Sequence, residues 1–422
     1  MNAWKWLGKV CSLTPGMRRI SLKLYYAWKA KQYRIFYADR YEVQSHTVVF
    51  EAYMGKKYAC SPKALYEAMM EDPAYRDWKK IWAFRNPEKY RFLEEKENTQ
   101  VVAYRKKAYY RAYGEAAYWI TNSRLPRELK PKKKQEYIQC WHGTPLKKLG
   151  YDLKQYAEQE GSLQEVRDNY LQESKRVTHM PSPSPFYSEK MCSAFHLKAL
   201  GKEKVLLELG YPRNDALYRA SGEECKCLRE KLGIPERKKV ILYAPTWRED
   251  QHIPGEGYGY RLQADFALWR ETLGEEYVVL FRAHYFISSQ FDFAAYGDFV
   301  IDVSQVDDVN ELYLAADLLI TDYSSVFFDY ANLERPILFY MYDYESYKHE
   351  MRDFYLDIHI LPGPVVKTQE ELLTKIKNLD EIVDEYREKY RIFNEMFNPH
   401  REVCSGKYLR EWLKQDDYSG AL

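Results

Sequence analysis

Residues 316–340 constrain the fold most, because they hold a complete strand, turn, helix and strand in one stretch. Leu318–Ile320 and Pro336–Tyr340 are short apolar runs of the kind found in buried parallel strands. Between them the polar turn Thr321–Ser325 leads into a helical pattern over Val326–Leu333. This order of elements predicts a βαβ unit, and therefore an α/β fold with a parallel sheet.

The polar turn also predicts a place for an anion. Ser324 and Ser325 lie where the N-cap of the following helix belongs. A helix start at the carboxyl end of a parallel strand presents backbone N–H groups and the positive end of the helix dipole to a ligand. The alternative is an ordinary capped helix, which α/β proteins contain many times. The turn alone leaves both interpretations open.

Strands and helices alternate along the rest of the chain, as in proteins with mainly parallel sheets. The segment from Lys204 to Asp215 is expected to cross between two halves, and the chain from Thr368 onwards is helical and charged. Further strands are expected at residues 47–51, 80–84, 100–103, 118–122, 135–141, 204–209, 277–281 and 299–302 and in a run that starts at 239, with helices at 62–70, 108–117 and 309–315.

Polar and cationic side chains follow several of these strands. Because the carboxyl ends of parallel strands meet at one edge of a sheet, such groups suit a negatively charged ligand in a cleft between two Rossmann-like halves. The first half contributes His142, which follows a strand and precedes Gly143 and Pro145, a residue suited to a helix start. The second half contributes Arg213 and Asp215, Thr246 and Arg248, Arg282 and His284, and residues 321–325.

The imidazole of His142 suits proton transfer near neutral pH. A lone histidine is often structural, so position alone does not decide its role. Neither a GxGxxG nor a P-loop pattern is present, and no His or Cys cluster has metal-ligand spacing. We therefore expect no dinucleotide, no metal and no other cofactor.

Composition places the chain among ordinary globular proteins. Of its 422 residues, 46% are hydrophobic and 30% are charged, and this length suits two or three domains. The seven scattered cysteines are typical of reduced thiols in the cytosol. A net charge of +2 does not indicate nucleic-acid binding. No apolar run reaches the roughly 18 residues of a membrane span, and no signal-peptide core is evident at the N-terminus.

The first 38 residues contain no Asp or Glu and mix Lys and Arg with Trp, Tyr and Leu. That composition is typical of a segment lying on an anionic membrane surface. Pro15 and Gly16 interrupt it, and Met17–Lys31 is the better helix candidate. The alternative is a basic helix packed on its own domain.

Five motifs occur in an order that resembles the CDP-glycerol glycerophosphotransferase family, the teichoic acid primases and polymerases of Gram-positive bacteria. Arg352–Asp357 and Pro362–Pro364 are also similar to the end of that family's catalytic domain, so the resemblance covers roughly residues 48–365. The five motifs are Cys140–Asp152, Gly210–Leu217, Tyr243–Arg248, Arg282–His284 and Ile320–Ala331.

The resemblance implies a GT-B-like fold with two Rossmann-like domains that face a central cleft. It implies a membrane-contact segment at 1–40, an acceptor domain at 41–205, a CDP-polyol-binding domain at 206–385 and a helical tail at 386–422. The tail would cross back onto the first domain or pair with another chain, so a homo-oligomer stays open.

The implied reaction transfers glycerol phosphate, or another polyol phosphate, from CDP-glycerol or CDP-ribitol and releases CMP. The acceptor would be a hydroxyl of an undecaprenyl-linked saccharide, which places the protein at the cytoplasmic face of the membrane as a peripheral enzyme. The sequence does not separate the two donors, and it does not separate a primase from a polymerase. Alternatives are a GT-B glycosyltransferase that uses a sugar nucleotide, and a non-catalytic membrane scaffold.

The resemblance also implies residue roles. His142 would act as the base, and His284, beside Arg282, would be the second catalytic histidine. Where His284 is followed by Tyr285, family members often have Pro, and this change bears on how the loop presents the donor. The remaining implied contacts are pyrophosphate for Thr321, Ser324 and Ser325, substrate for Gly143, Thr144 and Thr246, phosphates or domain closure for Arg213 and Arg248, and polyol hydroxyls or loop orientation for Asp322 and Asp329.

Overall fold

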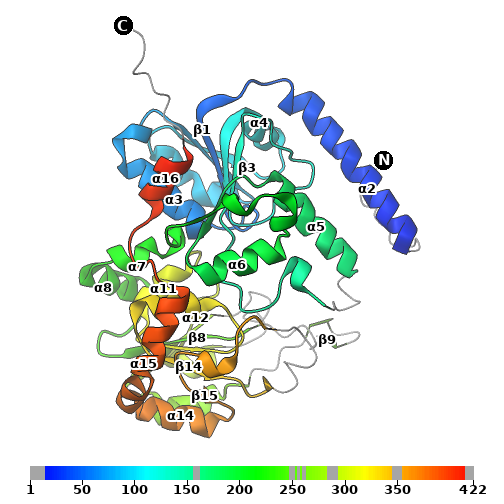
Figure 1. Ribbon diagram of the computed structural model, residues 1–422. Helices are drawn as coiled ribbons and strands as arrows, with labels where there is room; N and C mark the ends of the chain where they lie inside the picture. Colours follow the sequence, from blue (N-terminus) through cyan, green and yellow to red (C-terminus); the bar gives the residue numbers. More distant parts are fainter. Residues whose placement is uncertain are drawn as a thin grey trace.

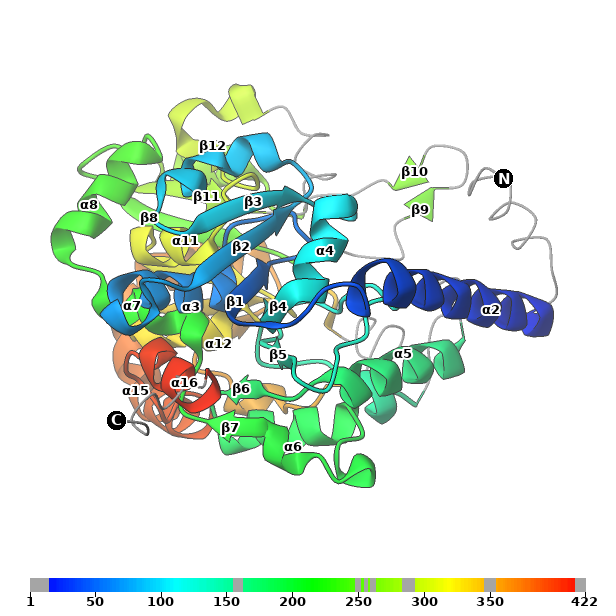
Figure 2. The same cartoon turned by 90° about the horizontal axis from the view of Figure 1, so that it is seen from above.

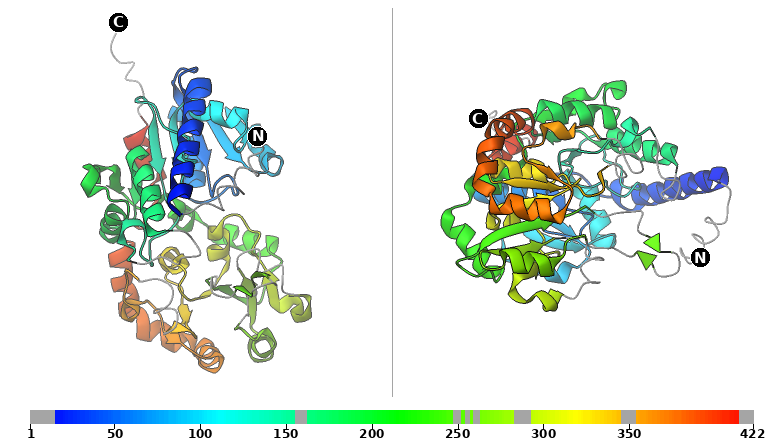
Figure 3. Two further views of the ribbon diagram at one scale, coloured as in Figure 1. Left: turned by 90° about the vertical axis from the view of Figure 1, so that its right-hand side faces the viewer. Right: turned by 90° about the horizontal axis from the view of Figure 1, so that it is seen from below.

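The chain forms two lobes, each centred on a parallel sheet, as Figure 1 and the left view of Figure 3 show. The computed structural model describes residues 15–154, 162–246, 252–253, 257–258, 263–282, 293–344 and 354–413. The first lobe holds a five-stranded sheet and the second a six-stranded sheet. The predicted α/β class is therefore confirmed.

The first sheet has the strand order β3-β2-β1-β4-β5, and all of its strand pairs are parallel. In its centre Val49 of β1 lies opposite Ile81 of β2 and Trp119 of β4. These strands are apolar on both faces because helices cover both faces. Their bounds are β1 Gln44–Glu51, β2 Lys79–Phe84, β3 Thr99–Ala103, β4 Ala116–Thr121 and β5 Glu136–Gln139.

The second sheet has the order β12-β11-β8-β13-β14-β15 and is also parallel throughout. Counted from its own first strand, this order repeats that of the first sheet and adds one strand, the arrangement of a Rossmann-type fold. Its bounds are β8 Lys239–Ala244, β11 Tyr277–Phe281, β12 Val300–Asp302, β13 Leu318–Thr321, β14 Ile337–Tyr340 and β15 Val365–Val366.

Helices cover both faces of each sheet. On the first sheet, Trp82 packs with Leu65 of α3 on one face, and Trp119 packs with Tyr113 of α4 on the other. A short antiparallel pair, β9 (His252–Ile253) and β10 (Gly257–Tyr258), lies outside both sheets. The helices are α3 Cys60–Glu71, α4 Lys107–Glu115, α5 Leu163–Arg176, α6 Pro185–Ala194, α7 Asp215–Arg219, α8 Gly222–Lys231, α9 Phe266–Leu273, α11 Val309–Ala315, α12 Val326–Tyr330 and α14 Gln369–Lys377.

The chain passes from the first lobe to the second after β7 (Leu206–Glu208), which pairs in parallel with β6 (Met180–Ser182). That pairing keeps residues 206–208 with the first lobe, so the expected boundary after residue 205 falls slightly early. Likewise α15 (Leu379–Phe397) continues through the expected boundary after residue 385.

The C-terminal helix α16 (Ser405–Trp412) returns to the first lobe and packs beside α3 (Figure 1). Its Tyr408 and Trp412 are buried in the core of that lobe. The carboxylate of Asp215 accepts the backbone N–H groups of Cys404 and Ser405, both at 2.9 Å. This contact ties the returning chain to the crossing segment.

At the N-terminal end of the described chain, helix α2 (Pro15–Tyr33) projects from the side of the first lobe (Figures 1 and 2). One stripe of it is apolar and exposed, and Leu24 is 67% and Trp28 is 53% exposed. Among the helices that the structure describes, neither α2 nor any other is long and apolar enough to span a bilayer.

Candidate active site

A cleft of about 430 Å³ lies where the carboxyl edges of the two sheets face each other. Its volume is within the range of small-molecule sites. One wall is the segment after β5, and the other comes from the loops after β8 and β13. The lining residues are Trp141, His142, Gly143, Thr144, Pro145, Leu146, Lys147 and Leu149 from the first wall, and Pro245, Thr246, Tyr323, Ser324 and Ser325 from the second.

The backbone turns sharply at Trp141 to bring His142 to the cleft. Trp141 has a left-handed φ of 52°, which an ordinary side chain rarely adopts. Its N–H donates to Oε1 of Gln139 at 3.0 Å, and its ring stacks on that of His142 with the ring centroids 4.6 Å apart. These contacts hold the strained turn in place.

The tautomer of His142 is set by a backbone oxygen. Nδ1 of His142 lies 2.8 Å from the carbonyl oxygen of Asn122. A carbonyl oxygen only accepts, so Nδ1 carries the proton and Nε2 keeps its lone pair. Enclosure by the protein lowers the pKa of His142 to about 4, and the charges of Arg213 and Arg124 act in the same direction.

His142 is enclosed by the walls of the cleft, yet its side chain is still exposed to the cleft itself. Solvent reaches this exposed surface and opposes part of the lowering of the pKa. Because burial lowers its pKa, the imidazole of His142 is neutral at pH 7, and its Nε2 carries the lone pair of a base.

Gly143 is where the two walls meet most closely. Its N–H donates to Oη of Tyr211 at 2.9 Å, and a Cβ added at this position would lie 3.0 Å from Oγ of Ser325. Glycine therefore allows a close approach between the segment after β5 and the loop after β13, and any larger residue would require Ser325 to shift. Thr144, also a predicted site residue, lines the cleft but is almost fully buried.

Arg213 connects the two walls from beneath. Its guanidinium donates to the carbonyl oxygen of His142 and forms an ion pair with Asp329, with Nη2 and Oδ2 3.1 Å apart. Only 5% of Arg213 is exposed. A buried pair of this kind positions groups and is costly to break. The sequence suggested that Arg213 lies directly at a strand end. In the structure it lies in a 3-10 turn (Pro212–Asn214).

The second wall is held by Asp322. Its Oδ1 accepts the backbone N–H groups of Thr246 at 2.8 Å and Tyr323 at 2.6 Å. Asp322 therefore joins the loops after β8 and β13. Of the two roles expected for Asp322 and Asp329, the contacts of both carboxylates favour orienting the loops.

Ser324 and Ser325 line the cleft, whereas Thr321 lies below it. The hydroxyl of Thr321 is fully buried and donates to the carbonyl oxygen of Ala244 at 2.8 Å. Ser325 is the N-cap residue of α12, but its side chain makes no capping hydrogen bond. The N-cap position expected for the serines is therefore confirmed for Ser325, and the helix expected over Val326–Leu333 consists of α12 followed by a 3-10 turn (Ala331–Leu333).

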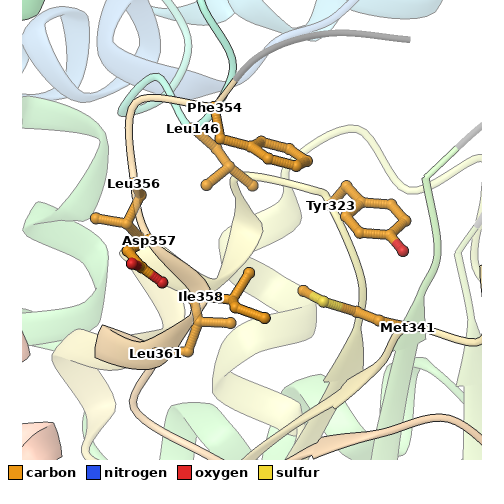
Figure 4. A pocket seen from close by; sticks show the side chains of 8 residues that line it. All are labelled: Leu146, Tyr323, Met341, Phe354, Leu356, Asp357, Ile358 and Leu361. Carbon is orange, nitrogen blue, oxygen red and sulfur yellow. The ribbon is translucent and has the colours of Figure 1, made fainter. Parts of the chain in front are cut away.

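The helix expected to start at Pro145 is absent. Instead Lys147 forms an antiparallel bridge with Phe354, and the N–H of Tyr355 donates to the carbonyl oxygen of Leu146 at 2.8 Å. This pairing to a distant segment replaces the local hydrogen bonds of a helix. Figure 4 shows the result beneath the cleft, where Leu146, Phe354 and Tyr323 gather around a small apolar cavity.

Of the predicted site residues Arg282, Arg248 and His284, the structure describes Arg282 only. Arg282 follows β11 and donates to the carbonyl oxygens of Val303 at 3.2 Å and Val306 at 3.0 Å. It is not among the residues that line the cleft. Arg248 and His284 lie outside the described residues, so their roles stay predictions.

The structure adds cleft residues that the sequence analysis did not single out. Lys147 brings a cation to the wall that carries His142, and Tyr323 brings a ring to the opposite wall. Lys147 belongs to the same motif as His142, and this proximity in the sequence could have identified it as a site residue. Within the described part of the chain, no group of three His, Cys, Asp or Glu side chains is arranged to hold a metal ion.

These features define a GT-B-like protein, with two Rossmann-type sheets facing one cleft. The family model described as CDP-Glycerol:Poly(glycerophosphate) glycerophosphotransferase matches residues 32–411, so the chain belongs to this family. The crystallised wall teichoic acid polymerase TagF is similar, with 36% sequence identity, a TM-score of 0.82 and coverage of 94% of this chain and 96% of that one.

Two curated relatives are similar at the level of sequence. The teichoic acid poly(glycerol phosphate) polymerase of Staphylococcus epidermidis is 39% identical over 377 residues, which are 89% of this chain and 51% of the relative. The teichoic acid glycerol-phosphate transferase of Staphylococcus aureus is 38% identical over 353 residues, which are 83% and 88% of the two chains. The chain thus spans about half the length of the first relative.

Proposed function

We propose that this chain transfers glycerol phosphate from CDP-glycerol to a hydroxyl of a lipid-linked saccharide, or of a polymer growing on it, and releases CMP. The observation that carries the proposal is the neutral His142, held by Asn122 on one wall of a cleft whose other wall offers Ser324 and Ser325. The relatives at 38–39% identity are named for glycerol phosphate, which favours glycerol over ribitol as the polyol.

In this reaction the acceptor oxygen forms a bond to the phosphorus that bears the glycerol, and the bond from that phosphorus to the CMP oxygen breaks. Nε2 of His142 takes the acceptor's proton as the new bond forms. The negative charge that develops on the departing CMP needs hydrogen-bond donors and cations already in place. The hydroxyls of Ser324 and Ser325, and the cations Arg248 and Arg282, are the candidates for this task, with His284 as a second catalytic group.

The two lobes would divide this work. The first, which holds His142, would take the acceptor, and the second, which holds the serines, would take the donor. Arg213 would keep the two in register, because it contacts the carbonyl oxygen of His142 and the carboxylate of Asp329 at once. Asp322 would act by holding the donor loops rather than by touching the polyol.

Helix α2 supports a peripheral position at the inner face of the membrane. Met17, Ile20, Leu24 and Trp28 recur at helical spacing and are exposed, and the helix carries basic but no acidic residues. Such a surface suits anionic lipid headgroups. Leu24→Glu with Trp28→Glu should reduce sedimentation with phosphatidylglycerol vesicles, while turnover of a detergent-soluble acceptor stays the same.

The donor decides between this function and a GT-B glycosyltransferase. The purified chain is incubated with a synthetic lipid-linked disaccharide and, in turn, CDP-glycerol, CDP-ribitol or a UDP-sugar, and the products are read by mass spectrometry. We expect a glycerol phosphate mass added with CDP-glycerol, together with CMP. A sugar added from the UDP-sugar, or no CMP from either CDP-polyol, would contradict the proposal. The number of added units separates a primase from a polymerase.

A further inference from the structure

At the junction of the lobes, Lys57 and Arg282 meet, and within the described residues neither forms an ion pair with a carboxylate. The junction contains two acidic residues of the second lobe, Asp307 and Asp308. Nζ of Lys89 lies 2.9 Å from Asp307, which also accepts the hydroxyl of Tyr90 at 2.8 Å. Nζ of Lys63 lies 2.9 Å from Asp308. Both carboxylates are thus already paired with the first lobe.

Lys57 and Arg282 approach the same oxygen from opposite lobes. Nζ of Lys57 donates to the carbonyl oxygen of Val306 at 3.3 Å, and Nη1 of Arg282 donates to it at 3.0 Å. The two nitrogens are therefore roughly 6 Å apart or less, since each is within hydrogen-bonding reach of one atom. Neither cation forms an ion pair with any carboxylate in the described ranges.

One neutral carbonyl does not balance two positive charges in a partly buried place. The electrostatics agree with the geometry. Burial, and then the nearby Arg282, lower the pKa of Lys57 to about 8, and the charges of Asp307 and Asp308 offset only part of this shift. Burial also lowers the pKa of Arg282. Both groups remain cations at pH 7, so the junction carries a surplus of positive charge.

The pair lies at the carboxyl ends of strands that belong to the two sheets, although neither residue lines the cleft itself. Arg282 ends β11, and its N–H donates to the carbonyl oxygen of Tyr243 at 2.9 Å, on the strand that leads to Thr246. Lys57 follows the turn after β1, in which the ring of Tyr53 lies 6.0 Å from that of His142. The cations therefore belong to the same carboxyl edges that build the cleft.

We propose that Lys57 and Arg282 form a phosphate-binding subsite that is completed only when the two lobes are together. The planar guanidinium suits two phosphate oxygens, and the ammonium adds a point charge from the other lobe. This inference rests on the proposed function for the source of the phosphate. That source is either the diphosphate of the donor or the phosphodiester of an acceptor that already carries glycerol phosphate.

The test compares Lys57→Met with the control Lys63→Met. The control also removes a cation from the junction, but Lys63 is already paired with Asp308. Inorganic pyrophosphate is the probe, and calorimetry reads its binding without any turnover. We expect Lys57→Met to weaken binding by about tenfold to a hundredfold. Lys63→Met should bind nearly as the parent does, and Lys57→Arg should retain most of the affinity. Thermal melting of each variant reports whether the lobes still pack.

Steady-state kinetics then identify the source of the phosphate. A raised KM for CDP-glycerol in Lys57→Met assigns the subsite to the donor, and a raised KM for the phosphate-bearing acceptor assigns it to the acceptor. Equal effects of Lys57→Met and Lys63→Met on pyrophosphate binding, or no effect of either, would overturn the subsite. Because pyrophosphate binding needs no turnover, the subsite survives or fails independently of whether CDP-glycerol is the donor.

Discussion

The two sheets share the order of five strands, to which the second adds a sixth, but they present different chemistry at their carboxyl edges. The edge of the first sheet offers one imidazole, whose proton position is set by the carbonyl oxygen of Asn122. The edge of the second offers the hydroxyls of Ser324 and Ser325, on loops joined by Asp322. In the proposed function, the first edge would remove a proton and the second would hold an anion.

The edges also differ in how they are supported. His142 sits on a strained turn and is exposed to the cleft, whereas Arg213 and Asp329 behind it are buried. The buried pair reaches both walls, so it is the element that makes two separate edges into one site. This contrast suggests that different mutations can separately change the rate of the reaction, the stability of the fold and the contact between the walls.

The largest expected effect is on the first edge. His142→Ala removes the base and should lower kcat by about 10²–10⁴-fold. Rapid-quench measurement of CMP release from CDP-glycerol checks this. The control is His359→Ala, because His359 is an exposed histidine on a surface turn. A near-parental kcat for His142→Ala would show that His142 is not the base of the reaction. Loss of CMP release with the fold intact would argue against a non-catalytic scaffold.

The next effect is on the pair that joins the edges. Arg213→Met leaves the Asp329 carboxylate buried without its partner, which should cost about 3–5 kcal/mol in the free energy of unfolding. Urea denaturation measures this cost. Arg219→Met is the matched control, since Arg219 pairs with Glu71 across the lobes at the surface, where such a pair contributes about 0–1 kcal/mol. Similar losses in the two variants would show that burial of Arg213 is not what matters.

A smaller effect tests the contact between the walls. Gly143→Ala adds a Cβ that would lie 3.0 Å from Oγ of Ser325, and we expect kcat/KM to fall by about tenfold. In a Ser325→Ala background the same change should cost less, because the opposing oxygen is gone. A double-mutant cycle on kcat/KM measures the difference. Strict additivity would mean that the walls do not meet there during catalysis.

The smallest effect is in the pH profile. If His142 is the base that we propose, its neutral form is active, so activity is present above its pKa and is lost as the pH falls through that value. Because the pKa of His142 is lowered, kcat should fall less between pH 7 and pH 5.5 than an imidazole of ordinary pKa would allow. An unshifted imidazole would instead cost about tenfold at pH 5.5. A stopped assay across pH 4.5–8 distinguishes these outcomes, with the buffer held at constant ionic strength.

Most of the strands of the two sheets, and several of the cleft residues, could be predicted from the sequence. Buried parallel strands are short unbroken apolar runs, so the strands of both sheets were predictable from local pattern, except for the two-residue edge strand β15. The placement of His142, Ser324 and Ser325 in one cleft follows from the rule that carboxyl ends of strands share an edge.

The remainder depends on partners far apart in the chain. The hydroxyl of Thr321 turns away from the cleft to the carbonyl oxygen of Ala244, on a neighbouring strand. The segment after Pro145 pairs with Phe354 instead of forming a helix. No local pattern indicates either contact. The surplus cation Lys57 was equally hidden, because its partner Val306 belongs to the other lobe.

The most direct test of the division between the edges is the affinity for CDP-glycerol, measured by calorimetry on His142→Ala and Ser325→Ala side by side. We predict a near-parental Kd for His142→Ala, despite its lost CMP release. We predict a Kd about tenfold weaker for Ser325→Ala, which should still release CMP. The reverse pattern, with His142→Ala failing to bind the donor and Ser325→Ala binding normally, would contradict this division.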